Sequence, residues 1–459
     1  MSKYINTKEK TRLISKKSKN IIYNVDPQYT LDKVFFLDDY ELHIFKLILK
    51  GYSVKEIITI VNKSNFLGYN ITETWIEDFV DKYNHFCFLS KTKEERNIDF
   101  DINVTDLLPD YFNCRNRFDF PIMLSIRLTN KCDSFCKYCF NNSNTGEITH
   151  LEFNRLINIL DESYTEGLRS INLTGGDPLL YINFIELLEY LNKRRFSFQF
   201  STKHILTEPE IRKLNRAGLK KIQISLDSVD DEVNYYLTGK KNYFRNMEES
   251  IKLLINYGIE VEVNSVVTSS SVKGIPKLFK ALRDLEVTRH FLTPFLISSG
   301  RGNKELCAQE EKYIRLEEFL NKERLKYQPM EIQLSIPEQS IDYSFSPGNN
   351  LVCTGGRLSL VINNNGDVTF CERLLDNKQF VVGNIYKQAL TDIWNSDNLK
   401  KFVNPSPIFF EDQPCEHCSK FNKCICENGL CYARVYQMNS IAFSIDPFCE
   451  KSNNKMRFH

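Results

Sequence analysis

The sequence lacks several features that would point directly to a membrane, an export route or a nucleic acid. No apolar run approaches the length of a membrane-spanning helix, and the opening residues MSKYINTKEKTRLISKKSKN lack the apolar core of a secretory signal. The 60 basic and 59 acidic residues leave a net charge of +1, so the global balance indicates neither nucleic acid nor an anionic membrane as a partner. We therefore expect a cytoplasmic protein with no membrane and no nucleic-acid partner.

The chain is, by contrast, rich in cysteine, with 14 among 459 residues. Because cytosolic thiols are kept reduced, this number indicates metal or redox chemistry rather than a disulfide framework. Three cysteines lie in one short loop and eight lie between Cys353 and Cys449. We interpret the three isolated ones, Cys87, Cys114 and Cys307, as buried or incidental thiols.

The short loop holds Cys132, Cys136 and Cys139 at positions i, i+4 and i+7, after an extended apolar segment. A cubane iron-sulfur cluster takes one thiolate per iron, so three ligands from one loop leave the fourth iron free for a cofactor or substrate. Structural zinc instead requires four ligands, and no histidine or fourth cysteine lies nearby in the sequence. The spacing favours a cluster with one open iron.

The N-terminal part predicts a flexible tail over residues 1–20, where seven basic residues accompany one acid. Residues 21–92 then predict a winged-helix-like domain with extended segments and three helices, which begin near Asp38, Ser53 and Thr72. The third helix carries four acidic residues, which argues against phosphate contacts and favours peptide capture by strand addition. This stretch resembles the peptide-recognition element of enzymes that modify ribosomally made peptides (RiPPs).

Beyond a linker at residues 93–120, strand-like and helix-like segments alternate, which is typical of an α/β fold built from parallel βα units. The predicted strands are residues 121–130, 170–174, 196–202, 221–226, 260–267 and 290–297. The predicted helices include residues 151–164, 182–191, 247–257 and 275–285. Six strands indicate a partial (β/α)6 barrel over residues 121–310, with its active site at the strand carboxyl ends.

The second predicted strand ends in Gly175-Gly176-Asp177-Pro178. Two glycines permit a close backbone approach to a ligand, and the neighbouring carboxylate suits the ammonium of an amino acid. The cysteine loop and this motif together resemble the radical S-adenosylmethionine (SAM) superfamily. That resemblance implies a [4Fe-4S] cluster on Cys132, Cys136 and Cys139, whose open iron binds SAM and which reductively cleaves it to a 5′-deoxyadenosyl radical.

The same resemblance implies cofactor contacts from Tyr138, Gly175, Gly176, Asp177, Ser225 and Asp227, with Ser225 at the ribose. Relatives usually hold the SAM carboxylate with an arginine shortly before a glycine, whereas here Tyr236-Leu237-Thr238 precedes Gly239. A buried carboxylate needs a charge partner, so we predict that Lys203 supplies the missing cation. Asn264 and the Gly300-Arg301-Gly302 turn are further candidates.

After a connecting region at residues 311–349, residues 350–459 hold eight cysteines, enough for two four-thiolate sites. A hairpin around the Asn365-Gly366 turn is expected to bring Cys353 and Cys371 together. Two structural zinc sites are one interpretation. The order of the cysteines instead resembles the SPASM domain, which carries two auxiliary [4Fe-4S] clusters.

The SPASM resemblance assigns each cysteine to a cluster. It implies an inner cluster on Cys353, Cys371 and Cys431, and an outer cluster on Cys415, Cys418, Cys424 and Cys449. The family usually has three residues between its fifth and sixth cysteines, but six lie between Cys424 and Cys431, with Cys426 among them. Either Cys426 is the fourth inner ligand, or the assignment of Cys431 is wrong, or the inner cluster keeps an open iron.

The order of the whole chain resembles RiPP maturases of the sactisynthase type. This implies a precursor peptide, with its leader on the N-terminal domain and its core at the barrel mouth, and a reductant such as flavodoxin or ferredoxin. We favour formation of a cysteine-to-carbon thioether crosslink. Alternatives are carbon-carbon crosslinking of the cyclophane or streptide-like kind, sulfatase-type formylglycine maturation, and a cluster-containing winged-helix redox regulator.

Overall fold

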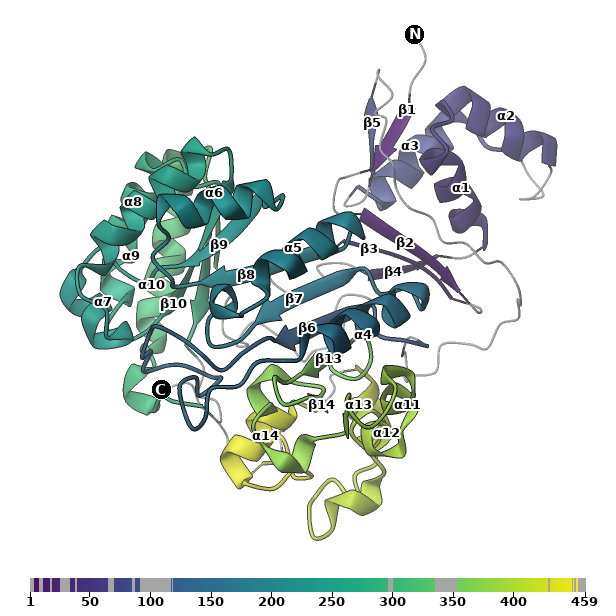
Figure 1. The fold of residues 1–459 in the computed structure, drawn as a ribbon. Coiled ribbons are helices and arrows are strands. Elements are labelled where there is room, and N and C mark those ends of the chain that lie inside the picture. Colours follow the sequence, from purple (N-terminus) through teal and green to yellow (C-terminus); the bar gives the residue numbers. More distant parts are fainter. Residues whose placement is uncertain are drawn as a thin grey trace. The chain divides into compact units, whose positions relative to one another are not determined.

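The computed structural model divides the chain into two compact units, residues 1–111 and 112–459, which are described separately (Figure 1). The described residues are 4–7, 11–16, 19–24, 34–37, 39–64, 70–84, 87–90, 117, 119–295, 300–334, 353–427, 430–447, 449 and 451–452. The predicted linker at residues 93–120 and Cys114 therefore lie almost wholly outside them. No helix in these ranges is both long and apolar enough to cross a membrane.

The first unit contains two small antiparallel sheets. Strand β1 (Tyr4–Thr7) pairs with β5 (Cys87–Ser90), while β2 (Thr11–Lys16), β3 (Lys19–Asn24) and β4 (Val34–Leu37) form the other sheet. The prediction of a flexible tail over residues 1–20 is therefore wrong. Short edge strands tolerate lysine, so the basic composition of this segment hid its strand pattern.

Three helices complete the first unit, and they lie where the sequence predicts them. They are α1 (Asp39–Leu49), α2 (Val54–Ser64) and α3 (Glu73–Lys82). At the start of α2, the Ser53 N–H donates to Glu56 Oε2 at 2.7 Å, as expected of a capping box. Phe45, Ile57 and Ile76 are fully buried between the helices, so this unit has a hydrophobic core of its own.

A ten-stranded sheet organises the second unit, in the order β12-β11-β10-β9-β8-β7-β6-β13-β14-β15. The parallel strands are β6 (Met123–Arg127), β7 (Ser170–Thr174), β8 (Ser197–Thr202), β9 (Lys221–Ser225), β10 (Glu260–Val267), β11 (Arg289–Pro294) and β12 (Glu331–Leu334). The six predicted strands are confirmed. Strand β12 adds a seventh, so the sheet continues past the predicted barrel end at residue 310.

Three further strands extend the other edge of this sheet. Strand β13 (Ser359–Ile362) runs parallel to β6, and β14 (Asp367–Thr369) and β15 (Gly383–Asn384) follow it in antiparallel order. The predicted hairpin between β13 and β14 is present, and Gly366 in its turn has a φ of +83°. The barrel sheet and the cysteine-rich region therefore share one continuous hydrogen-bonded sheet.

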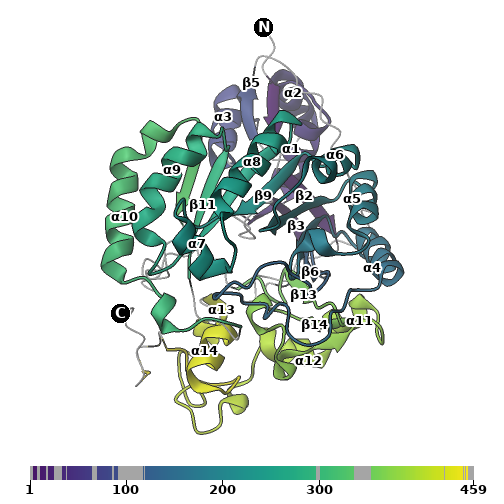
Figure 2. The same ribbon diagram turned by 60° about the vertical axis from the view of Figure 1, so that its left-hand side comes forward.

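Helices cover the outer side of the curved sheet (Figure 2). They are α4 (Phe153–Thr165), α5 (Phe184–Lys193), α6 (Glu208–Arg216), α7 (Asp231–Thr238), α8 (Tyr243–Asn256), α9 (Ile275–Asp284) and α10 (Glu310–Glu323). The C-terminal helices are α11 (Leu390–Asn395), α12 (Asp397–Val403), α13 (Phe421–Glu427) and α14 (Tyr432–Asn439). Short 3-10 helices are η1 (Pro178–Leu180), η2 (Val272–Gly274), η3 (Lys304–Leu306), η4 (Arg324–Tyr327), η6 (Glu372–Leu374), η7 (Lys378–Phe380) and η8 (Pro407–Phe410).

The two faces of the barrel sheet differ in polarity because side chains alternate along each strand. Leu124 and Ile171 are neighbours in register on the apolar face. On the opposite face, Ser125, Asn172 and Gln199 align across β6, β7 and β8. The fold thus provides a polar surface leading to the strand carboxyl ends, where the cysteine loop lies.

Candidate active site

The cysteine loop leaves the carboxyl end of β6 and is held by backbone hydrogen bonds along its length. These run from Cys132 N to Asn144 Oδ1 (2.8 Å), Phe135 N to Thr238 O (2.9 Å), Lys137 N to Leu237 O (2.8 Å) and Arg301 N to Cys139 O (2.7 Å). The loop is therefore fixed by the segment that follows it, by the end of α7 and by the turn after β11. The predicted Gly300-Arg301-Gly302 candidate accordingly packs against this loop.

The three thiols of the loop lie close enough together to interact electrostatically. The pKa of Cys132 is raised to about 11 and that of Cys136 to about 12, chiefly by burial, and the nearby Cys139 contributes to both increases. Three such thiolates would repel one another, whereas a metal centre compensates their charge and deprotonates them. The donor set therefore fits a cluster that uses three protein ligands.

The two glycines after β7 allow close contact with the segment that leads into Cys132. A Cβ on Gly176 would lie 2.0 Å from Lys131 O, and one on Gly175 would lie 2.8 Å from Thr129 O. The Gly176 N–H also donates to Thr129 O at 2.7 Å. The close backbone approach that the sequence predicts is thus made to the protein's own chain, which fixes the start of the cysteine loop.

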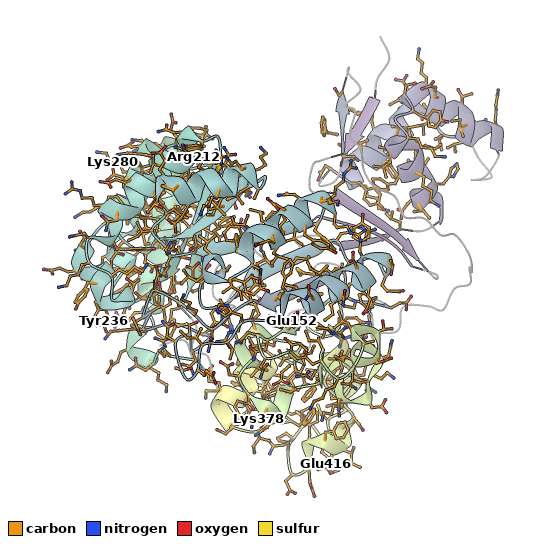
Figure 3. The ribbon with its side chains drawn as sticks, viewed as in Figure 1. Glu152, Arg212, Tyr236, Lys280, Lys378 and Glu416 are labelled. Atoms are coloured by element: carbon orange, nitrogen blue, oxygen red, sulfur yellow. The ribbon has the colours of Figure 1, made fainter. Side chains whose placement is uncertain are left out.

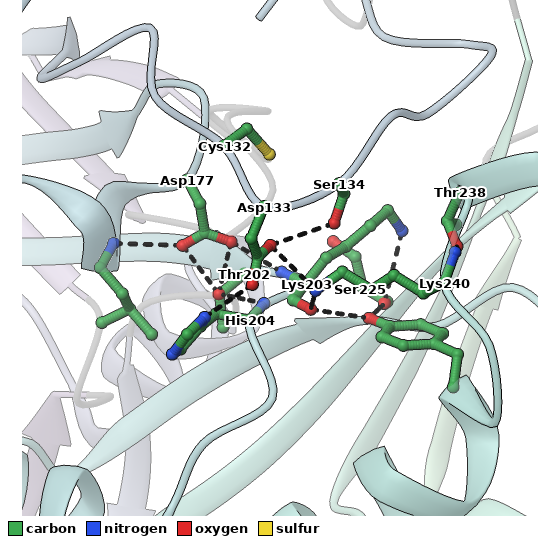
Figure 4. A network of polar contacts seen from close by, with 12 residues as sticks. Cys132, Asp133, Ser134, Asp177, Thr202, Lys203, His204, Ser225, Thr238 and Lys240 are labelled. Atoms are coloured by element: carbon green, nitrogen blue, oxygen red, sulfur yellow. Dashed lines mark hydrogen bonds and ion pairs between the residues drawn. The ribbon is translucent and has the colours of Figure 1, made fainter. Parts of the chain in front are cut away.

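Asp177 belongs to an internal hydrogen-bond network (Figure 4). Its carboxylate is 2% exposed and accepts bonds from Thr202 Oγ1 (2.7 and 2.8 Å), Lys203 N (3.0 Å) and Leu179 N (3.1 Å). Burial raises the pKa of Asp177, while these bonds lower it. The side chain is held in place within the protein, and its charge reaches the cysteine loop, where it contributes to the raised pKa of Cys132.

Three of the predicted cofactor-binding residues come together from separate segments: Tyr138, Lys203 and Asp227. The fully buried Asp227 carboxylate accepts hydrogen bonds from Tyr138 Oη and, at 2.8 Å, from Val266 N. It also forms an ion pair with Lys203 Nζ at 3.3 Å. Burial raises the pKa of Tyr138 well above its usual range. Lys203 is thus paired already, but its charge also reaches the loop, since it lowers the pKa of Cys136 against the effect of burial.

Ser225 lies at the end of β9 beside this group. Its Oγ is 2.7 Å from Ser201 Oγ, and its carbonyl accepts a bond from Tyr243 Oη at 2.8 Å. Asn264 lies in register with Ser225, on the neighbouring strand β10, and accepts a bond from Thr293 at 2.9 Å. These hydroxyl and amide groups are the polar side chains that the sheet offers next to the loop.

Asp133, which directly follows the first cysteine of the loop, was missed as a site residue. Its Oδ2 lies 2.7 Å from His204 Nδ1, and its Oδ1 lies 2.9 Å from Lys240 Nζ. Hydrogen bonds to Asp133 and, to a lesser extent, to Glu210 raise the pKa of His204 to about 9. Burial alone would raise the pKa of Asp133, but bonds from His204 and Lys240 lower it to about 2. Its place between two cysteines was the one available signal in the sequence.

A second missed feature joins the polar sheet face to the cysteine-rich region. Glu372, next to Cys371, accepts hydrogen bonds from Asn172 Nδ2 at 3.0 Å and from Ser125 Oγ. The buried side chain of Arg127 likewise donates to Asp376 Oδ1 at 2.7 Å. The residue after a predicted auxiliary ligand therefore contacts the barrel strands directly.

The C-terminal thiols fall into two groups. Cys371 is influenced by Cys353 and Cys431, while Cys415 is influenced by Cys449, Cys424 and Cys418. Burial is the main cause that raises the pKa of both Cys371 and Cys415, each to about 12. This grouping is the same as that implied by the SPASM resemblance. Cys426 lies within α13, but its side chain is outside the described residues.

The described cysteines are all free thiols. Within the described ranges, no group of three or more His, Cys, Asp or Glu side chains is arranged to hold a metal ion. A cubane differs from a single-ion site because it spreads its thiolates over separate iron atoms.

Family comparisons agree with both cysteine-bearing regions. Residues 126–275 match the radical SAM superfamily, and residues 353–420 match SPASM, an iron-sulfur cluster-binding domain. The chain therefore contains a radical SAM domain followed by a SPASM domain. Its implied cofactors are [4Fe-4S] clusters and SAM.

Its relatives include peptide maturases. It is 27% identical over 349 residues to the subtilosin biosynthesis protein AlbA of Bacillus subtilis, covering 74% of this chain and 73% of AlbA. It is 26% identical over 343 residues to the mycofactocin maturase MftC of Mycolicibacterium smegmatis, covering 72% and 83%. The structure of Streptococcus suis SuiB bound to precursor peptide SuiA matches with a TM-score of 0.68 at 19% identity, over 97% of this chain and 100% of SuiB.

Proposed function

We propose that the protein is a RiPP maturase that installs cysteine-to-carbon thioether crosslinks in a precursor peptide. The observation that carries this proposal is the combination of one three-thiol loop, two downstream thiol groups and a separately folded N-terminal unit. Similarity to AlbA supports the thioether, and the match to peptide-bound SuiB over 97% of this chain supports a peptide substrate.

The loop thiols Cys132, Cys136 and Cys139 would hold the first cluster. Bound there with SAM, it supplies a carbon radical that removes a hydrogen atom from a peptide residue. Lys203 would balance the SAM carboxylate, since a cation beside the loop with a side chain only 11% exposed is suited to that role. Ser225 would contact the ribose, and Gly175, Gly176 and Asp177 would help to bind the amine.

The N-terminal unit would bind the leader peptide. Among the strands that the structure describes, β2 and β4 are the edges of the sheet ordered β2-β3-β4, so either could accept an added peptide strand. A leader held on the protein raises the local concentration of the attached core peptide near the barrel. This assignment replaces DNA binding, in agreement with the exposed acidic residues Glu77, Asp78 and Asp81 on α3.

Auxiliary clusters held by the two groups of C-terminal thiols would accept the electron that crosslinking releases. Forming a C–S bond from a C–H and an S–H removes one hydrogen atom, one proton and one further electron. The hydrogen atom goes to the carbon radical and the proton to solvent, so the electron needs an acceptor. Auxiliary clusters on Cys353, Cys371 and Cys431 and on Cys415, Cys418, Cys424 and Cys449 would provide it.

Coexpression with a candidate precursor, followed by mass spectrometry, tests the proposal. Each link should lower the peptide mass by two hydrogens, and an unchanged mass would rule out crosslinking. A thioether also consumes a thiol, so alkylation with iodoacetamide should label fewer cysteines in the product. Loss of two hydrogens with all thiols still alkylated would instead favour a carbon-carbon link.

The role of Lys203 has a direct test of its own. Lys203→Ala should weaken SAM binding, measured by equilibrium dialysis with the reconstituted protein. Lys213→Ala, at an exposed position on α6, is the matched control and should bind SAM like the wild type. Equal affinity in all three proteins would show that Lys203 does not hold the carboxylate.

A further inference from the structure

An ion pair between Arg434 and Asp446 connects the two groups of C-terminal thiols. The inner group is Cys353, Cys371 and Cys431, and the outer group is Cys415, Cys418, Cys424 and Cys449. Arg434 Nε and Nη2 donate to Asp446 Oδ1 and Oδ2 at 3.0 and 2.7 Å, so the guanidinium binds both carboxylate oxygens. Each side chain is 14% exposed. The bidentate geometry gives the pair a defined orientation, and the low exposure limits its screening by solvent.

The guanidinium end of the pair acts on the inner group. Cys431 is the N-cap of α14, where the helix dipole favours negative charge, and Arg434 lies three residues further on, in the first turn. Burial raises the pKa of Cys431, while the charge of Arg434 and a hydrogen bond from its backbone N–H oppose this increase. Arg434 therefore stabilises negative charge at the inner group.

The carboxylate end of the pair acts on the outer group. Asp446 precedes Cys449 by three residues, and the Cys449 N–H donates to Asp446 O at 2.8 Å. Burial is the main cause of the raised pKa of Cys415, and the other outer thiols and the Asp446 carboxylate contribute to it. The pair thus presents its positive end to the inner group and its negative end to the outer group.

Further charges at the inner group are mainly positive. The charge of Arg373 opposes the burial that raises the pKa of Cys371. Arg357, which is 7% exposed, lines one cavity together with Cys353. Glu372 is an acid beside Cys371, and hydrogen bonds from strands β6 and β7 partly compensate its charge. Through Glu372, the inner group is also the one joined to the barrel sheet.

Further charges at the outer group are mixed and lie nearer to solvent. The ammonium of the exposed Lys451 is 3.6 Å from Cys418 Sγ, while Glu416, next to Cys415, has a side chain that is 30% exposed. Figure 3 shows Glu416 at the lower edge of the C-terminal region. Solvent and salt screen such charges more strongly than an enclosed ion pair. The Arg434–Asp446 pair therefore supplies a charge difference between the two groups that is little screened.

We propose that the Arg434–Asp446 ion pair makes the inner auxiliary cluster easier to reduce and the outer one harder to reduce, which draws the electron released by crosslinking to the inner cluster. The proposal rests on the proposed function, which assigns these thiols to two clusters. The substrate loses one electron as the C–S bond forms, one cluster gains it, and the proton goes to solvent. Because reduction adds negative charge to a cluster, a nearby cation favours it and a nearby carboxylate opposes it. Arg434 and Asp446 are thus positioning residues that need not touch the substrate.

Potentiometric titration followed by electron paramagnetic resonance tests the proposal. It uses the full chain with the three loop cysteines replaced by alanine, which keeps only the auxiliary clusters and needs neither SAM nor peptide. The reduction step that is lost in C415A/C418A belongs to the outer cluster. R434Q/D446N should lower the midpoint potential of the inner cluster and raise that of the outer cluster. An expected tenfold change in each reduction equilibrium corresponds to about 59 mV.

Single variants separate the electrostatic role from a structural one. R434K keeps the positive charge but not the bidentate geometry, so the inner potential should stay close to that of the native pair, whereas R434Q should lower it. D446N should raise the outer potential, and it tests the carboxylate separately if the double variant loses a cluster.

The matched control is a surface ion pair on α6. E208Q/R212Q removes a contact of 2.8 Å between two side chains that are each about half exposed, and it should leave both potentials unchanged. Figure 3 shows Arg212 away from the C-terminal region.

Four results would overturn the proposal. They are unchanged potentials in R434Q/D446N, a shift of both clusters in the same direction, an equal shift of the inner potential in R434K and R434Q, and a wild type without reducible auxiliary clusters. None of these measurements involves the peptide, so failure of the crosslinking proposal is recognised separately, by an unchanged peptide mass.

Discussion

The ion pair between Asp133 and His204 gives a quantitative test of how the cysteine loop is held. His204→Ala removes the partner that lies 2.7 Å from Asp133 Oδ2 and leaves Lys240 in place. It also removes the weaker contact between His204 Nε2 and Glu210 Oε1 at 3.1 Å. A charge-assisted hydrogen bond contributes about 1.5–3 kcal/mol. Because the His204 and Asp133 side chains are 20% and 33% exposed, solvent screening reduces the expected loss of unfolding free energy to about 1–2 kcal/mol.

The same pair predicts a pH dependence with a definite sign. Hydrogen bonds to Asp133 and, to a lesser extent, to Glu210 raise the pKa of His204 from 6.5 to about 9 in the folded protein. Such a group contributes its full stability below its unfolded pKa and loses that contribution as pH rises through the folded pKa. The wild type should therefore lose stability between pH 6.5 and 9, and His204→Ala should lose markedly less.

Urea unfolding of the reduced apoprotein at pH 6.5 and pH 9 measures this loss of stability. In the protein loaded with its cluster, the rate of iron release to a chelator measures how firmly the cysteine loop is held. His417→Ala is the matched control, since the His417 side chain is 89% exposed. The reasoning is refuted if His204→Ala has the stability and pH slope of the wild type. It is equally refuted if His417→Ala shows the same loss.

Two further predictions concern the loop's support and the buried core. Gly176→Ala would place a Cβ 2.0 Å from Lys131 O, so iron analysis should show the loss of about one four-iron cluster per chain. Gly274→Ala is the control, because its Cβ would lie 3.4 Å from the nearest atom, Ser228 Oγ. This control variant should retain its full iron content. Burial lowers the pKa of His290 to about 3, so the wild type should lose about 2 kcal/mol of unfolding free energy on going from neutral pH to pH 5. The unfolding free energy of His290→Leu should not show this pH dependence. Urea unfolding of both proteins at neutral pH and at pH 5 measures it, and an equal change in the two proteins would contradict the account.

The sequence predicted the central strands well because each has a distinct local pattern. Strands β6 to β11 combine apolar residues with an alternating polar face and are separated by helical segments. Strand β12 was missed because Glu331–Leu334 offers only four alternating residues, too few to distinguish from a loop. Strands β1 and β2 were missed because lysines dominated the composition of a segment whose pairing partners lie elsewhere in the chain.

The candidate site was predictable where its chemistry depends on spacing along the chain. Three thiols in eight residues indicate a cluster by themselves. The Asp133–His204 pair joins positions 71 residues apart, so no local pattern shows it. Gly176 was recognised as a close-approach glycine, but only the fold reveals that the approach is to Lys131 and not to a ligand.

One measurement tests the central claim most directly: 5′-deoxyadenosine and peptide mass followed together in a single anaerobic reaction with SAM, dithionite and the precursor peptide. The account predicts deoxyadenosine formation that rises when precursor is added, with about one molecule formed for each pair of hydrogens lost from the peptide. The Cys132→Ala, Cys136→Ala, Cys139→Ala triple variant should form neither product. Deoxyadenosine at the wild-type rate in that variant, or a fully loaded wild type that leaves SAM intact, would contradict the account.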